Sequence, residues 1–230
     1  MHIEPGVVNG AKIALSYGTA SVAFAGTAAY VAGHLKKQGL GSLIAKSAIA
    51  TAAVFFSFEV MFHYPVGVSE VHLIFGTSLL LLFGVAPAAL GLTLGLLIQG
   101  LFFAPTDLPQ YAMNVTTLLV PLFALHWMVT RITRPGQAYK DLKYSQVLRF
   151  SLTYQGGIVA WVAFWAFYGH GFTIENAHAV GTFGVAYLSV VLIEPIVDLA
   201  LLALAKSYAS SLSEAPSKNI LLESRLFYNN

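Results

Sequence analysis

The chain opens with Met-His-Ile-Glu-Pro-Gly, and its first two residues carry three nitrogen atoms that could bind one metal ion. The amine of Met1, the backbone nitrogen of His2 and the imidazole of His2 are spaced to close two adjoining chelate rings. These donors lie in one plane, and a fourth nitrogen would complete a square that Ni(II) and similar ions accept. Zn(II), which prefers a tetrahedron, fits poorly. A solvated terminal histidine without metal is the alternative interpretation.

The chemistry requires an uncapped amine at Met1. Residues 1–9 contain neither Lys nor Arg and include Glu4, Pro5 and Gly6, unlike the basic start of a signal peptide. We therefore expect the amine to be free and the bulky His2 to protect Met1 from removal.

A second candidate ligand lies in the stretch PVGVSEVHLIFG, residues 65–76. Pro65 and Gly67 should break the backbone, and His72 follows about one turn inside an apolar run. An ionisable group at that depth in a membrane is costly and marks a functional candidate. The alternative is an interfacial histidine on a helix that Ser69 caps, with Glu70 in its first turn. The sequence leaves both interpretations open.

The composition places these residues in a membrane protein. Of 230 residues, 57% are hydrophobic, only 10% are charged and none is cysteine, whereas soluble domains average about 25% charged residues. Thiolate metal sites are excluded, so a metal must be bound by nitrogen or oxygen. The formal net charge of +2 and the lack of a binding motif argue against nucleic acid as a partner.

Hydropathy predicts an all-α, polytopic protein with about seven transmembrane helices, because a span needs roughly 20 apolar residues. The third span is short, and Gly84 with Pro87 should join it to the fourth in a tight turn. We expect one transmembrane domain over residues 1–206 and a polar cytoplasmic tail over 207–230. The expected spans are 11–33, 43–62, 70–84, 86–104, 113–131, 147–168 and 179–205.

The cations set the expected orientation, since Lys and Arg near span ends stay in the cytoplasm. With the N-terminus outside, eleven of the twelve Lys and Arg fall on the cytoplasmic side and only Lys12 lies outside. The outer segments then gather five of the seven histidines and four of the ten acidic residues, a rim that attracts cations. These are His2, Glu4, His63, Glu70, His72, Asp107, His170, Glu175 and His178.

Three segments of the chain resemble the substrate-binding subunit of cobalt and nickel energy-coupling factor transporters, the CbiM/NikM family. They are Met1 to Gly6, the block Pro65 to Gly76, preceded by FSFEVMF, and LLIQGLFF at Leu96 to Phe103, followed by Asn114. The resemblance covers roughly the first 125 residues in order and spacing.

The resemblance implies that the N-terminus folds back into the helices and binds Co2+ or Ni2+ through Met1, His2 and His72. The metal is then a transported substrate, and the chain is not an enzyme. Partners would be a transmembrane coupling subunit (EcfT/CbiQ-like), ATPase subunits (CbiO-like) and possibly a small accessory membrane subunit, all at the inner membrane. The chain itself has no G-x-x-x-x-G-K-[ST] motif for ATP hydrolysis.

Several further residues are candidates for supporting roles. Ser69, His63, Gln99 and Asn114 could orient the metal ligands, with packing the alternative for Gln99 and Asn114. Small residues spaced four apart permit close helix contact, so Ala48 and Ala52 are candidates for docking the coupling subunit.

Two alternatives remain. A haem- or copper-binding membrane redox subunit would need paired histidines within spans, and only His126 lies deep in one. A purely structural multi-span protein is the other. For Glu194 and Asp198, which share a helix face, an ion path competes with the interpretation we prefer, local pairing with Lys206 or Arg149.

Overall fold

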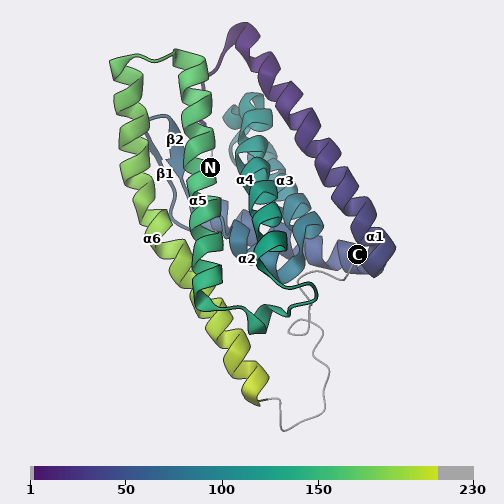
Figure 1. The fold of residues 1–230 in the computed structure, drawn as a ribbon. Coiled ribbons are helices and arrows are strands. Elements are labelled where there is room, and N and C mark those ends of the chain that lie inside the picture. Colours follow the sequence, from purple (N-terminus) through teal and green to yellow (C-terminus); the bar gives the residue numbers. More distant parts are fainter. Residues whose placement is uncertain (1–2, 212–230) are drawn as a thin grey trace.

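The computed structural model describes the backbone of residues 3–211, and it is mostly helical (Figure 1). Two short strands and several short helical turns complete these residues. The strands are β1 (Tyr64–Val66) and β2 (Ser69–Val71). The helices are α1 (Ala14–Phe55), α2 (Gly76–Phe83), α3 (Val85–Phe102), α4 (Tyr111–Ile132), α5 (Tyr144–His170) and α6 (Ile174–Ser211).

Five segments of the described chain are helices long and apolar enough to cross a membrane. They confirm a multi-span α-helical protein, but they do not confirm the predicted number of seven. The expected domain end at residue 206 falls within α6. Of the expected tail over 207–230, residues 207–211 continue α6 and residues 212–230 lie outside the described residues. The five segments are Gly10–Val60, Val85–Phe102, Pro105–Ile132, Tyr144–His170 and Ile174–Ser207.

The first two predicted spans both lie within α1 and the short π-helical turn after it. Gly39, at φ 78° and ψ 171°, departs from helical geometry and divides α1 into two straight parts. Such a positive φ is readily adopted only by glycine. Figure 1 shows the chain turning sharply at the lower end of α1. A kink, rather than a loop, therefore separates the two apolar stretches.

The third predicted span, 70–84, is wrong as a helix over its first half. Val66 pairs with Ser69 across a tight turn at Gly67, where φ is 63°, and the two strands are antiparallel. Residues 72–75 belong to neither a strand nor a helix, and α2 has only eight residues. Strand pairing satisfies backbone groups of β2, whose Ser69 and Val71 are buried, which explains how non-helical chain is tolerated beside the helices.

Close helix packing surrounds the hairpin. Gly91 and Gly95 of α3 lie against α1, where an added Cβ would meet the Cβ of Ala50 at 2.4 Å or Cγ1 of Val54 at 2.6 Å. Helix α5 packs between α4 and α6. Gly67 of the hairpin turn lies against the backbone of Ala179 in α6. The turn of the hairpin is thus held against α6.

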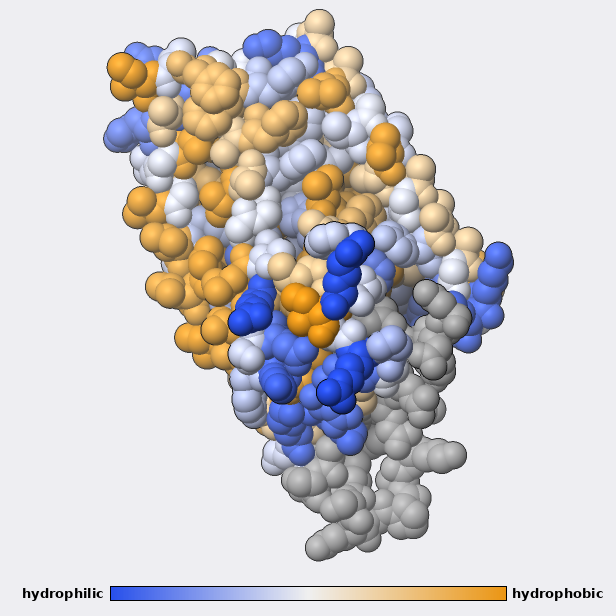
Figure 2. Space-filling model, viewed as in Figure 1, coloured by the Kyte–Doolittle hydropathy of each residue, from blue (hydrophilic) through white to orange (hydrophobic). Residues whose placement is uncertain are grey.

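The two ends of the molecule differ. The link from α4 to α5 and the C-terminal part of α6 lie at the lower end of Figure 1, together with the turn of α1. The start of α1 and the link from α5 to α6 lie at the opposite end. Figure 2 shows apolar residues over much of the visible face and strongly hydrophilic residues gathered at the lower end.

Candidate metal site

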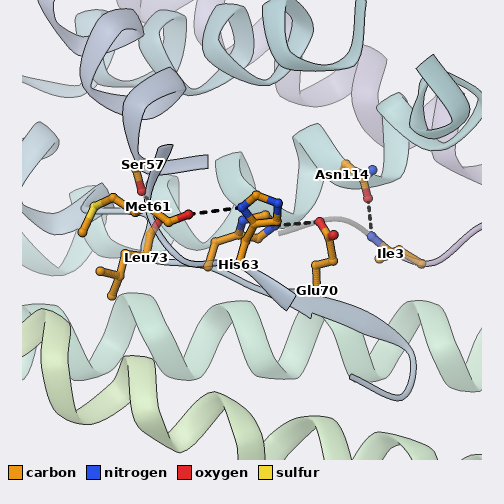
Figure 3. A network of polar contacts seen from close by, with 8 residues as sticks. Ile3, Ser57, Met61, His63, Glu70, Leu73 and Asn114 are labelled. Carbon is orange, nitrogen blue, oxygen red and sulfur yellow. Dashed lines mark hydrogen bonds and ion pairs between the residues drawn. The ribbon is translucent and has the colours of Figure 1, made fainter. Parts of the chain in front are cut away.

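The first described residues run beside the hairpin. Ile3, only 1% exposed, forms an antiparallel bridge with Ser69. Its amide donates a hydrogen bond of 2.8 Å to Oδ1 of Asn114 in α4, drawn in Figure 3. The amide of Glu4 donates to the carbonyl of Val68 at 3.1 Å. The start of the chain therefore extends the two-stranded sheet and is buried among the helices.

The N-terminal segment, residues 3–13, also forms hydrogen bonds with the C-terminal end of α5. The ammonium of Lys12 donates to the carbonyls of Tyr168 and Gly169 at 3.0 and 2.8 Å. Cations are favoured at this end of a helix, where carbonyls lack intrahelical partners. Nε2 of His170 lies 3.1 Å from the carbonyl oxygen of Gly6. Sequence reasoning did not predict these contacts, although Lys12 stood out as the lone outer cation.

His72 is fully buried directly after β2. Its Nε2 lies 3.0 Å from Oε2 of Glu70. The ring of His63 stacks on it with centroids 5.5 Å apart, and the ring of Phe58 lies at 5.1 Å. Figure 3 shows His63 and Glu70 turned toward the same region. The imidazole thus has a carboxylate at one edge and aromatic rings around it.

The alternative of a capped helix at His72 is wrong. Ser69, the expected cap, is a fully buried residue of β2. The helix begins only at Gly76, with Phe75 as its N-cap residue. His72 therefore belongs to the non-helical segment that links β2 to α2.

Two side chains hold the backbone of the segment that follows His72. The hydroxyl of Ser57 donates to the carbonyl of Leu73. The amides of Ile74 and Phe75 donate to the carboxylate of Glu194 in α6.

The predicted pairing of Glu194 and Asp198 with Lys206 or Arg149 is not found. Lys206 instead donates to the carbonyl of Lys140 at 2.6 Å, and Asp198 accepts a hydrogen bond from Ser78 of α2. Backbone amides and neutral donors approach these buried acids, because the chain around α2 leaves such groups without partners of its own.

Three acidic side chains lie close together beside the N-terminal segment. Burial raises the pKa of Glu4, and the nearby carboxylates of Glu70 and Asp107 raise it further. Asp107 also lines a cavity of about 170 Å³, which includes open solvent, together with Tyr111 and Asn114. A cation entering here would meet these negative charges. Of the Lys and Arg residues, only Lys12 falls in the segments expected outside the membrane.

Of the predicted metal ligands Met1, His2 and His72, the structure describes only His72. Met1 and His2 lie outside the described residues. Within residues 3–207, no three side chains of His, Cys, Asp or Glu gather closely enough to hold a metal ion. Of the predicted supporting residues, Ser69, His63 and Asn114 lie beside His72 or Ile3.

The other candidates lie elsewhere. Gln99 is buried in α3, and its Oε1 has no hydrogen-bond partner among the described residues. Ala48 and Ala52 are exposed on α1. His126, which a haem or copper subunit would use, packs edge-on against the ring of Tyr30 with centroids 5.0 Å apart.

Comparisons with known proteins agree with this fold. Two crystal structures, described as a transition metal transporter and a truncated transition metal transporter, share it. The first has a TM-score of 0.60 and 19% identity over 97% of both chains. The second has a TM-score of 0.58 and 19% identity over 92% of this chain and 99% of its own.

Sequence comparison identifies the family. No curated protein sequence matches this chain. The sequence pattern of CbiM, the cobalt uptake substrate-specific transmembrane region, matches residues 2–212 and so covers nearly all of the described fold. The chain therefore belongs to the CbiM family of transmembrane components for cobalt uptake.

Proposed function

We propose that the protein is the substrate-binding subunit of an energy-coupling factor transporter that imports Co2+ or Ni2+ across the inner membrane. The metal is bound by the amine of Met1, the backbone nitrogen and imidazole of His2, and the imidazole of His72. The observation that carries this proposal is the position of Ile3. It directly follows His2 and is fixed against Asn114 and against Ser69, which lies three residues before His72.

The direction of the sheet supports this ligand set. In an antiparallel bridge, moving toward lower numbers on one chain means moving toward higher numbers on the other. From Ile3 opposite Ser69, this direction leads along β2 to His72. A terminal amine that continued along β2 would approach the buried imidazole.

The contact between His72 and Glu70 also suits a ligand. An Nε2 proton donated to Glu70, at 3.0 Å, leaves the lone pair of the neutral imidazole on Nδ1, where a metal ion can use it. Metal-binding histidines commonly donate their other ring proton to a carboxylate in this way.

The proposal includes the predicted seven-span orientation with the N-terminus outside. Gly39 allows the helical segment Gly10–Val60 to cross twice. Its 51 residues span about 77 Å of helix, which exceeds two crossings of the roughly 30 Å core of a bilayer. The coupling and ATPase subunits then supply the energy, and the exposed Ala48 and Ala52 are the proposed docking face for the coupling subunit.

A metal titration of the purified protein tests the ligand set. We expect wild type to bind one Ni2+ or Co2+, and His2→Ala, His72→Ala and a one-residue extension before Met1 each to weaken binding by about 100-fold or more. His178→Ala is the matched control, since His178 is an exposed histidine at the start of α6. Equal affinity in wild type and all three variants would refute the ligand set.

A further inference from the structure

We propose that Glu194 is a positioning residue for His72: its carboxylate holds the Leu73–Ile74 and Ile74–Phe75 peptides, which begin one residue beyond His72, and thereby sets the direction of the imidazole. This role rests on the proposed function, because it concerns the same metal site. Glu194 lies in α6, 120 positions from Ile74 in the sequence, and the hydrogen bonds described for its carboxylate are to the amides of Ile74 and Phe75 and to Gln155.

The carboxylate of Glu194 is fully buried, and both its oxygens accept hydrogen bonds. Oε1 accepts from the amide of Ile74 and, at 3.1 Å, from the amide of Phe75. Oε2 accepts from the side-chain amide of Gln155 in α5. The carbonyl of Gln155 in turn accepts from the hydroxyl of Tyr187 at 2.6 Å. Helices α5 and α6 therefore hold the carboxylate in place.

The peptide that Glu194 holds has little support from regular structure. Strand β2 ends at Val71 and α2 begins at Gly76, so residues 72–75 belong to neither. Phe75 has a left-handed backbone with φ 59°, which is uncommon for a residue other than glycine. A conformation of this kind persists only where surrounding groups enforce it. Glu194 accepts hydrogen bonds from the two amides nearest this bend.

Ser57 acts on the same segment from the opposite direction. Its hydroxyl, in the π-helical turn after α1, donates to the carbonyl of Leu73. The peptide groups that follow His72 are thus held by one donor and one acceptor on different helices. A shift of Glu194 would rotate these peptides and change the direction in which the imidazole of His72 points.

Asp198 provides a matched comparison. It lies one helical turn beyond Glu194 in α6, is 1% exposed, and accepts a hydrogen bond from Ser78. Asp198 also interacts with Ser151 and with the backbone amide of Ser78, so its contacts are to the first turn of α2 and to α5 rather than to the amides of residues 73–75. Loss of Asp198 should therefore weaken the fold and leave the peptide at His72 in place.

The test is a Co2+ titration of the full-length purified protein, followed by the ligand-field absorption of the bound cobalt and by competition with a chelator. Glu194→Gln keeps an oxygen for the amides of Ile74 and Phe75, and Gln155 can turn its amide to match. We expect its absorption band to be unchanged and its Kd to stay within about 3-fold. Glu194→Asp withdraws the carboxylate by about 1.5 Å. We expect a shifted band and a Kd weakened by about 10-fold to 100-fold, as is typical when a group that orients a ligand is lost.

Glu194→Ala should shift the cobalt absorption band and weaken the Kd as Glu194→Asp does. If Glu194→Ala does not fold, the comparison of Glu194→Asp with Glu194→Gln tests the positioning role. Asp198→Ala should lower the thermal midpoint while keeping the wild-type band and Kd. A wild-type band and affinity in Glu194→Asp, or an equal band shift in Asp198→Ala, overturns the positioning role. If His72→Ala binds cobalt as tightly as wild type, the proposed function fails as well. Loss of binding in His72→Ala with an unaltered Glu194→Asp overturns the positioning role alone.

Discussion

The backbone amide of Ile3 lies 2.8 Å from Oδ1 of Asn114, although 111 positions separate the two residues. Asn114 is 1% exposed in the first turns of α4, and Ile3 also bridges to Ser69 of the hairpin. The Oδ1 atom of Asn114 therefore joins Ile3 to helix α4, in addition to the pairing of Ile3 with Ser69.

Asn114→Ala should weaken metal binding by about 10-fold. The substitution leaves the buried amide of Ile3 without its acceptor, which costs about 1–3 kcal/mol, so the N-terminal segment binds its site less firmly. A nickel titration of the purified protein measures the effect. Thr117→Ala is the control, because the buried Thr117 hydroxyl bonds only within α4, to Met113. Equal affinities in the two variants would show that Asn114 has no part in holding the segment.

Lys12→Met should release the N-terminal segment from α5 to a smaller extent. The exposed ammonium donates to two carbonyls at the end of that helix, an interaction worth about 0.3–1 kcal/mol. We expect faster hydrogen exchange in residues 3–13 and a metal Kd weakened by about 2-fold to 5-fold. Lys36→Met removes the same charge from an exposed position on α1, and it should change neither measurement. Unaltered exchange in Lys12→Met would contradict the proposed tether.

Glu4→Gln should slow metal capture by about 2-fold to 5-fold. Glu4, Glu70 and Asp107 lie close enough for their charges to interact, and their combined field attracts a dication. Because salt screens exposed charges, the difference from wild type should shrink as salt is raised from about 10 mM to about 500 mM, concentrations on either side of the ~0.1 M at which screening becomes strong. Stopped-flow kinetics measure the rates of capture. Glu175→Gln, at an exposed glutamate early in α6, supplies the control, and an identical slowing there would point to net charge alone.

Gly91→Ala should destabilise the fold. An added Cβ would lie 2.4 Å from the Cβ of Ala50 and 2.9 Å from its backbone carbonyl carbon, and overpacking of this kind costs about 1–3 kcal/mol. The thermal midpoint in detergent should fall. Gly18→Ala is the matched helical control, because nothing lies within 4 Å of the corresponding position. A midpoint that is equal in both variants would argue against tight packing of α3 on α1.

Periodicity and hydropathy predicted the membrane class and most of the helices, since long apolar stretches have few alternatives in a bilayer. They did not predict two features of the chain: a kink that separates two spans without a loop, and an apolar segment that is not helical. Gly39 divides α1 by backbone geometry alone, and hydropathy does not register a kink. Residues 73–75 are as apolar as a helix would be, and only the backbone path from β2 through the left-handed Phe75 to Gly76 shows that they are not helical.

The site was partly predictable from its residues. His72 and Asn114 stood out because polar groups in apolar stretches need partners. The structure places Asn114 against Ile3, and His72 three residues after Ser69, which pairs with Ile3. Glu194 stood out for the same reason, yet its partners were assigned to nearby cations. The true partners are the amides of Ile74 and Phe75. Main-chain amides are present at every position, and only the three-dimensional path of the chain shows which of them lack a partner.

The sheet that Ile3 completes imposes an order on biosynthesis. The ribosome makes Ile3 more than a hundred residues before its acceptor Asn114. Gly6 is made 164 positions before His170. The segment that contains Ile3 and Gly6 therefore cannot complete these contacts until α3, α4 and α5 have been made, so it docks late.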